Sequence, residues 1–128
     1  MKRALLAGFQ AGVLAGILAC LGFAATAQDE VESADGAVLR GLDKVNGQTV
    51  DIELRSGGTT AVFGLEVALA DCRYPADNPT GDAFAFLTIR EKNKPEIWFE
   101  GWMIASAPAL SALDHARYDV WVLRCTTS

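Results

Sequence analysis

The sequence predicts an all-β domain, a small antiparallel β-sandwich or partly open barrel of about seven strands with one short helical turn. Residues 49–55 alternate between apolar and polar side chains, which is the period of a half-buried strand. Turn-forming Gly, Pro, Asn and Asp residues separate further short apolar segments, and no segment has the spacing of a strand–helix–strand unit. Such a chain buries its core between antiparallel sheets.

The first 27 residues have the layout of a secretory signal peptide. Lys2 and Arg3 precede an apolar stretch over residues 4–25, and the small residues that end at Ala27 are followed by polar ones. Cleavage after Ala27 predicts export to the periplasm, with no membrane insertion of the remaining chain. Two alternatives stay open: an uncleaved helix that anchors the protein in the inner membrane, and a lipoprotein signal at Cys20.

Charge and composition exclude several classes of protein. The 128 residues are 51% hydrophobic and 21% charged, with a net charge of −5, which argues against a disordered chain. Removal of residues 1–27 leaves nine basic residues against sixteen acidic ones, a charge of −7. An acidic domain of this kind has no electrostatic reason to bind nucleic acid. We expect residues 28–36 to form a flexible acidic leader and residues 37–128 a single β domain.

The strands follow from alternation and from the turn residues between them. Asn46 and Gly47 form a strong hairpin signal, Gly57 lies in the next turn, and the two prolines within residues 73–82 predict a surface loop. Gly101 suggests a bulge or a close contact with a neighbouring ring. The predicted strands are residues 37–42, 49–55, 59–63, 65–72, 83–90, 96–104 and 118–125.

The helical turn is predicted within residues 106–115. Pro108 suits the first turn of a helix, and Leu110 and Leu113 would share one face of it. We expect this short helix or 3₁₀ segment to cover one end of the sheets. In the last strand, simple alternation places Trp121, Leu123 and Cys125 on one face.

Two cysteines remain after signal cleavage, and they predict one disulfide. Thiols of exported domains tend to oxidise, and Cys72 and Cys125 allow a single pairing. The bridge would close a loop of about 54 residues and contribute about 4 kcal/mol of stability by the chain-entropy model. The Cα atoms should then lie roughly 4.4–6.8 Å apart.

His115, the single histidine, is the first candidate for chemistry. Asp114 precedes it, and Ser106 and Ser111 are near in sequence, so the residue types of a Ser–His–Asp hydrolase are present. Chain neighbours rarely face each other, however, and no glycines of a nucleophile elbow flank either serine. We therefore expect a structural histidine hydrogen-bonded to backbone in a protein that is not an enzyme, with a hydrolase as a remote alternative. No metal or cofactor is expected, since the paired spacing of zinc ligands is absent.

Aromatic residues offer a second candidate site. Exposed rings on adjacent strands stack on sugars, whereas buried rings fill a core, and the sequence favours the core without excluding a glycan-binding surface. The residues concerned are Trp98, Phe99, Trp102, Tyr118 and Trp121.

The C-terminal stretch GWMIASAPALSALDHARYDVWVLRC, residues 101–125, resembles the bacterial domain-of-unknown-function family 2155. Exported, mostly alphaproteobacterial proteins of that family end in a similar GWM…S.P.L.A..H…YDVW…C pattern. Residues 42–47, Cys72, Ala83 and Phe84 also fit, while Ala116 stands where the family often has proline. The resemblance implies no known activity, cofactor or catalytic residue. Relatives are often encoded near an accessory protein of the respiratory NADH dehydrogenase.

We therefore expect an exported, non-enzymatic β-domain that acts through protein–protein contacts. The partner would be another envelope protein, and the domain an accessory subunit of an envelope or respiratory membrane complex. A small-ligand or glycan-binding module is the alternative. The candidate interaction or turn-locking residues are Trp102, Ser106, Ser111, Asp114 and His115.

Overall fold

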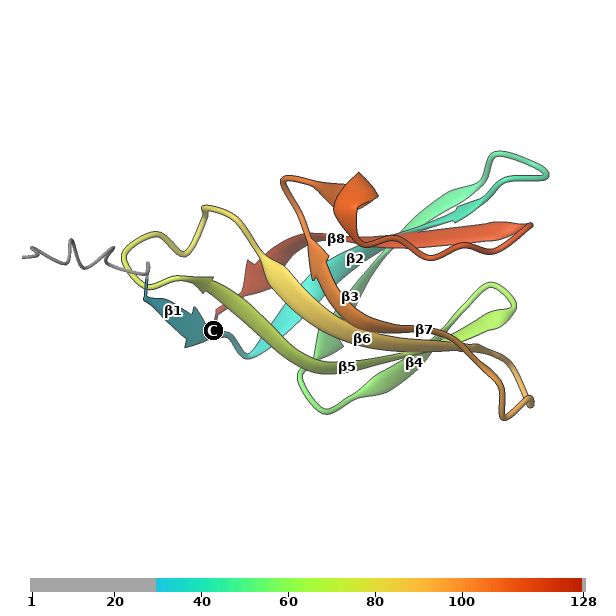
Figure 1. Cartoon of the computed structure of the whole chain (residues 1–128), viewed down its shortest axis with the longest axis horizontal. Helices are drawn as coiled ribbons and strands as arrows, with labels where there is room; N and C mark the ends of the chain where they lie inside the picture. The colour runs from blue at the N-terminus through green and yellow to red at the C-terminus, as the bar shows by residue number, and fades with distance from the viewer. Residues whose placement is uncertain (1–29, 128) are drawn as a thin grey trace, which may run out of the picture.

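Two antiparallel sheets packed face to face form the domain (Figure 1). The computed structural model describes residues 30–127, so the predicted signal peptide lies outside the described residues. No helix within residues 30–127 is long and apolar enough to span a bilayer. The β-sandwich prediction is confirmed, and the sheets do not close into a barrel.

The larger sheet has the order β1–β5–β6–β7, and β4 pairs with the same long strand β5. Its strands are β1 (Val31–Ser33), β4 (Thr59–Val62), β5 (Leu65–Pro75), β6 (Phe84–Glu91) and β7 (Ile97–Ile104). The smaller sheet has the order β3–β2–β8. Its strands are β2 (Gly36–Asp43), β3 (Thr49–Arg55) and β8 (Tyr118–Thr126). The predicted helical turn is the 3₁₀ segment η1 (Pro108–Leu110), between β7 and β8.

The segment expected to be a flexible leader instead carries an eighth strand. β1 pairs with residues 73–75 of β5, which extends β5 into the predicted surface loop. Ala34 is buried, and its N–H donates to the carbonyl of Cys72 at 2.7 Å. The acidic composition gave no strand signal, because this short strand depends on the free edge of β5 rather than on an apolar pattern of its own.

The core lies between the sheets, where apolar side chains of both inner faces meet. Gly41 permits a close approach, since a Cβ atom there would lie 2.5 Å from Cγ1 of Val62 in the opposite sheet. Gly101 lies under the ring of Phe99, at 3.6 Å from an added Cβ atom, which is the close ring contact that was one of its two predicted roles. The largest fully buried side chains include Leu39, Leu65, Leu69, Leu87, Ile89 and Met103.

Two slips in strand register decide which faces the cysteines occupy. In β5 the pairing with β6 skips Ala70, and in β8 the pairing with β2 skips Leu123. A one-residue slip moves every later side chain to the other face of the sheet. Cys125 therefore points inward, and the prediction that it shares a face with Trp121 and Leu123 is wrong.

The disulfide between Cys72 and Cys125 joins the two sheets, as predicted. The Cα atoms are 5.7 Å apart, within the expected range. One cysteine belongs to β5 of the larger sheet and the other to β8 of the smaller, near the end of the domain where the chain ends (Figure 1). The bridge therefore fixes the separation of the sheets at this end.

Removal of the bridge should lower the free energy of unfolding by about 4 kcal/mol, because the unfolded chain gains the entropy of the opened loop. The double variant Cys72→Ala/Cys125→Ala measures this loss by urea denaturation. Reduced wild-type protein is the matched control and should unfold at the same urea concentration as the variant. Equal midpoints for oxidised wild type and the variant would contradict the stabilising role.

Candidate functional site

A cluster of aromatic rings fills the end of the sandwich opposite the disulfide. The turn before β8 meets the β2–β3 and β4–β5 hairpins there, at the right of Figure 1. The rings of Tyr118 and Phe63 stack at 5.9 Å, and those of Tyr118 and His115 at 5.3 Å. Trp98 contacts His115 edge-on at 4.6 Å. We call Phe63, Trp98, His115 and Tyr118 the His115 cluster.

The hydrogen bonds of His115 lock the turn before β8. The ring is buried, and Nδ1 accepts the backbone N–H groups of Arg117 at 3.0 Å and Tyr118 at 3.1 Å. Because Nδ1 accepts two hydrogen bonds, Nε2 carries the ring proton and donates it to Oε1 of Glu91 at 2.9 Å. His115 therefore connects the turn to the end of β6 in the opposite sheet.

An ion pair between the buried Asp43 and the half-exposed Arg117 ties the β2–β3 hairpin to the same turn. Asp43 is only 3% exposed, and its Oδ2 lies 3.0 Å from Nη2 of Arg117. Its Oδ1 also accepts the N–H of Val45 at 3.0 Å. The hydrogen-bonded Arg117 guanidinium holds the pKa of Asp43 below its usual value. Lys44 adds a bond from its ammonium group to the carbonyl of His115.

Within residues 30–127, His115 makes no hydrogen bond to Ser106, Ser111 or Asp114. The carboxylate partner of His115 is Glu91 rather than Asp114. Ser106 donates its hydroxyl to Oδ2 of Asp82 at 2.6 Å and its N–H to Oδ1 at 2.9 Å, which clamps the end of β7 to the start of β6. Ser111 lies beside η1, and neither it nor the exposed Asp114 makes a side-chain hydrogen bond within residues 30–127.

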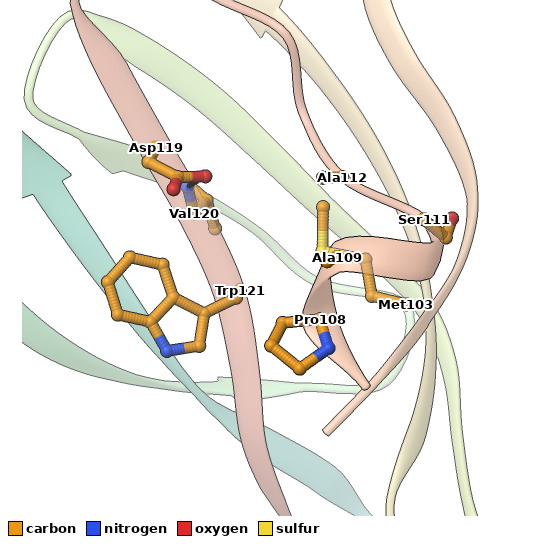
Figure 2. A pocket seen from close by; sticks show the side chains of 8 residues that line it. All are labelled: Met103, Pro108, Ala109, Ser111, Ala112, Asp119, Val120 and Trp121. Carbon is orange, nitrogen blue, oxygen red and sulfur yellow. Dashed lines mark hydrogen bonds between the residues drawn. The ribbon is translucent and has the colours of Figure 1, made fainter. Parts of the chain in front are cut away.

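A groove of about 320 Å³ lies between η1 and β8 (Figure 2). Side chains of β8 line one side, the η1 segment forms the other, and Met103 of β7 also contributes to the lining. Most of the lining is apolar, and the one charged group is Asp119. The lining residues are Met103, Pro108, Ala109, Ser111, Ala112, Asp119, Val120 and Trp121.

The outer face of the larger sheet carries an apolar patch. We call it the outer patch; its members are Val31, Phe84, Phe86, Trp102 and Ile104. Trp102 is 37% exposed and Val31 is 44% exposed. Trp102 contacts the ring of Phe86 edge-on at 5.4 Å, and the guanidinium of Arg73 lies 4.8 Å from the centre of its ring.

The five aromatic residues of the sequence-based glycan hypothesis do not share one surface. Trp98 and Tyr118 belong to the His115 cluster, and Phe99 packs against the core. Trp121 lines the groove, so only Trp102 lies in the outer patch. The sequence of β6 could have indicated the outer patch, because this strand is apolar on both faces. Because a sandwich covers only one face of each sheet, one apolar face of β6 has to point outward, and it is the face with Phe84 and Phe86.

Replacement of His115 by Gln should lower the free energy of unfolding by about 2 kcal/mol, or several degrees of melting temperature. Glutamine has an amide donor for Glu91 and a carbonyl acceptor, but it lacks the rigid ring that holds both nitrogens in place and stacks on Tyr118. Thermal and urea denaturation measure the loss. Asp114→Asn, next to it and exposed, is the control and should melt like wild type; equal stability of both variants would contradict a turn-locking role.

The Asp43–Arg117 pair predicts a pH-dependent share of stability. The pKa of Asp43 is lower in the folded protein than its unfolded value of 3.8. The pair therefore contributes its full stabilisation above pH 3.8, and this stabilisation is lost as the pH falls through the folded-state pKa. Asp43→Asn should therefore unfold more easily than wild type at neutral pH, and the difference should narrow below pH 3.8. Urea denaturation over a pH series tests this. Arg117→Gln should show the same convergence, and a constant difference at all pH values would contradict it.

Comparison with known proteins places the domain in a bacterial family. Residues 37–125 match the family model described as an uncharacterized protein conserved in bacteria, DUF2155. A relative from Rickettsia prowazekii (strain Madrid E), "Uncharacterized protein RP359", is 26% identical over 87 residues, which is 66% of this chain and 56% of the relative. The chain thus spans little more than half the length of that relative. No solved structure matches the chain. The family match covers nearly the whole described domain, and the chain belongs to the DUF2155 family.

Proposed function

We propose that this protein is an exported, non-enzymatic domain that binds another envelope protein through the outer patch. The observation that carries the proposal is the exposure of Trp102 and Val31 on a sheet face that no other element within residues 30–127 covers. Exposed apolar patches of this kind mark interaction sites. The partner would be a subunit of an envelope membrane complex with an apolar contact surface.

Trp102 and the adjoining Arg73 suit a protein interface. Tryptophan and arginine are enriched among the residues that contribute most to protein–protein binding. Arg73 also pairs with Asp71, whose Oδ2 lies 2.8 Å from its Nε, so the rim of the patch is charge-balanced. An apolar partner surface without a strong charge therefore matches this patch better than a strongly acidic or basic one.

The same geometry weakens the glycan alternative. A sugar ring stacks on an open aromatic face, but the Arg73 guanidinium already lies over the indole of Trp102. The edge contact with Phe86 further restricts access to the ring. A sugar would have to displace Arg73, whereas a protein surface can cover both side chains together.

Export is supported by two independent features of the chain. Disulfides persist in oxidising compartments such as the periplasm, and Cys72 and Cys125 are bonded. The first 27 residues have the features of a secretory signal. We place the domain in the periplasm, with the inner-membrane anchor as the alternative.

Trp102→Glu should abolish binding of the partner without unfolding the domain, because it puts a charge at the centre of an apolar contact. Tagged wild type, Trp102→Glu and Val31→Glu are purified from solubilised membranes of the native bacterium and compared by quantitative mass spectrometry. We expect one envelope protein to fall by about tenfold or more in both patch variants. Val45→Glu is the control, since Val45 is 73% exposed in the β2–β3 hairpin, far from the patch.

Melting temperatures of all variants separate loss of binding from loss of folding. Retention of every co-purifying protein by folded Trp102→Glu and Val31→Glu would overturn the proposal. A glycan that raises the melting temperature of wild type but not of Trp102→Glu would favour the glycan-binding alternative instead.

A further inference from the structure

The groove between η1 and β8 has a different chemical character from the outer patch. Pro108 and Ala109 form one side, and Trp121 and Asp119 of β8 lie along the other (Figure 2). Its volume of about 320 Å³ is at the small end of the range for ligand sites. An apolar, aromatic-lined space with one carboxylate resembles the sites that accept cationic groups.

Asp119 has a carboxylate that the fold leaves largely unpaired. Its Oδ1 accepts the N–H of the next residue, Val120, at 2.9 Å. No side chain within residues 30–127 forms an ion pair or hydrogen bond with it. Lys44 acts on Asp119 through its charge, and its ammonium group donates a hydrogen bond to the carbonyl of His115. Burial raises the pKa of Asp119 above its usual value.

We propose that this groove binds an organic cation, an ammonium or guanidinium group on an apolar stem. The Asp119 carboxylate pairs with the positive charge of the ligand, and this ion pair replaces the contact with water that burial removed. The indole of Trp121 lies on the same strand two residues along and offers its ring to the cation, while Pro108 and Ala109 contact the stem. Nine basic residues against sixteen acidic ones remain after removal of residues 1–27, and the resulting charge of −7 favours approach of cations.

This site is separate from the proposed protein contact. Trp102 and Met103 are neighbours on β7, but Trp102 lies in the outer patch while Met103 lines the groove. Two kinds of molecule carry such a cationic group. One is a free alkylamine or guanidine, and the other is a partner protein with a lysine or arginine side chain.

Amide NMR spectra of the isotope-labelled exported domain, with its disulfide intact, test the proposal. The probes are agmatine and the capped amino acid Nα-acetyl-lysine methylamide, with n-butanol as a neutral analogue. We expect saturable shifts at residues 109–112, at residues 119–121 and at the Trp121 indole N–H with the cations only. Asp119→Asn keeps the acceptor for Val120 and removes the charge, so it should weaken binding by about tenfold or more.

Asp114→Asn is the matched control, because it removes an exposed carboxylate from the loop before β8 and should bind like wild type. Tighter binding of agmatine would identify a free cation as the ligand, and tighter binding of the capped lysine a protein side chain. Three results would overturn the proposal: no saturable shift with either cation at millimolar concentration, equal binding by n-butanol, or equal weakening in Asp114→Asn. None of these depends on the outer patch, so the site can fail while the proposed protein contact holds.

Discussion

The inter-sheet disulfide is the constraint on which the arrangement of both sheets depends. Neither cysteine would face the core if its strand alternated regularly from the preceding core residues. The slip that skips Ala70 turns Cys72 inward after Leu69, and the slip that skips Leu123 does the same for Cys125 after Val122. The first slip has a second consequence, because it turns Arg73 outward, where its guanidinium lies over Trp102. The slip in β5 thus positions both Cys72 for the disulfide and Arg73 at the rim of the outer patch.

At the other end of the sandwich, no covalent link joins the sheets within residues 30–127, and polar and aromatic contacts hold them together. His115 connects the turn before β8 to Glu91 of the larger sheet, and Arg117 connects the same turn to Asp43 of the smaller. A domain of this size buries a limited apolar core, so such contacts form a large fraction of its net stability. The histidine is therefore used for folding: one ring nitrogen accepts two backbone N–H groups and the other donates to a carboxylate.

Sequence patterns predicted those elements whose formation depends on residues close together in the chain. Alternation over residues 49–55 gave β3 within its observed bounds, Pro108 marked η1, and the two cysteines allowed only the pairing observed. The features that were missed depend on contacts distant in sequence. β1 forms because β5 offers a free edge, and the register slips depend on the partner strands rather than on the strand that bulges. For the same reason the groove was not predicted, since its two sides come together only when η1 lies against β8.

The stretch that carries the family resemblance contains residues of the His115 cluster and of both proposed binding surfaces. His115 and Tyr118 belong to the cluster that closes one end of the domain, and a packing role accounts for them. Packing does not account in the same way for Trp102, which is more than a third exposed, or for Asp119, whose carboxylate lacks a side-chain partner within the described residues. A fold that needed only stability would gain from a polar residue at the first position and a neutral one at the second. Folding alone therefore does not explain these two side chains, and each belongs to one of the two proposed binding surfaces.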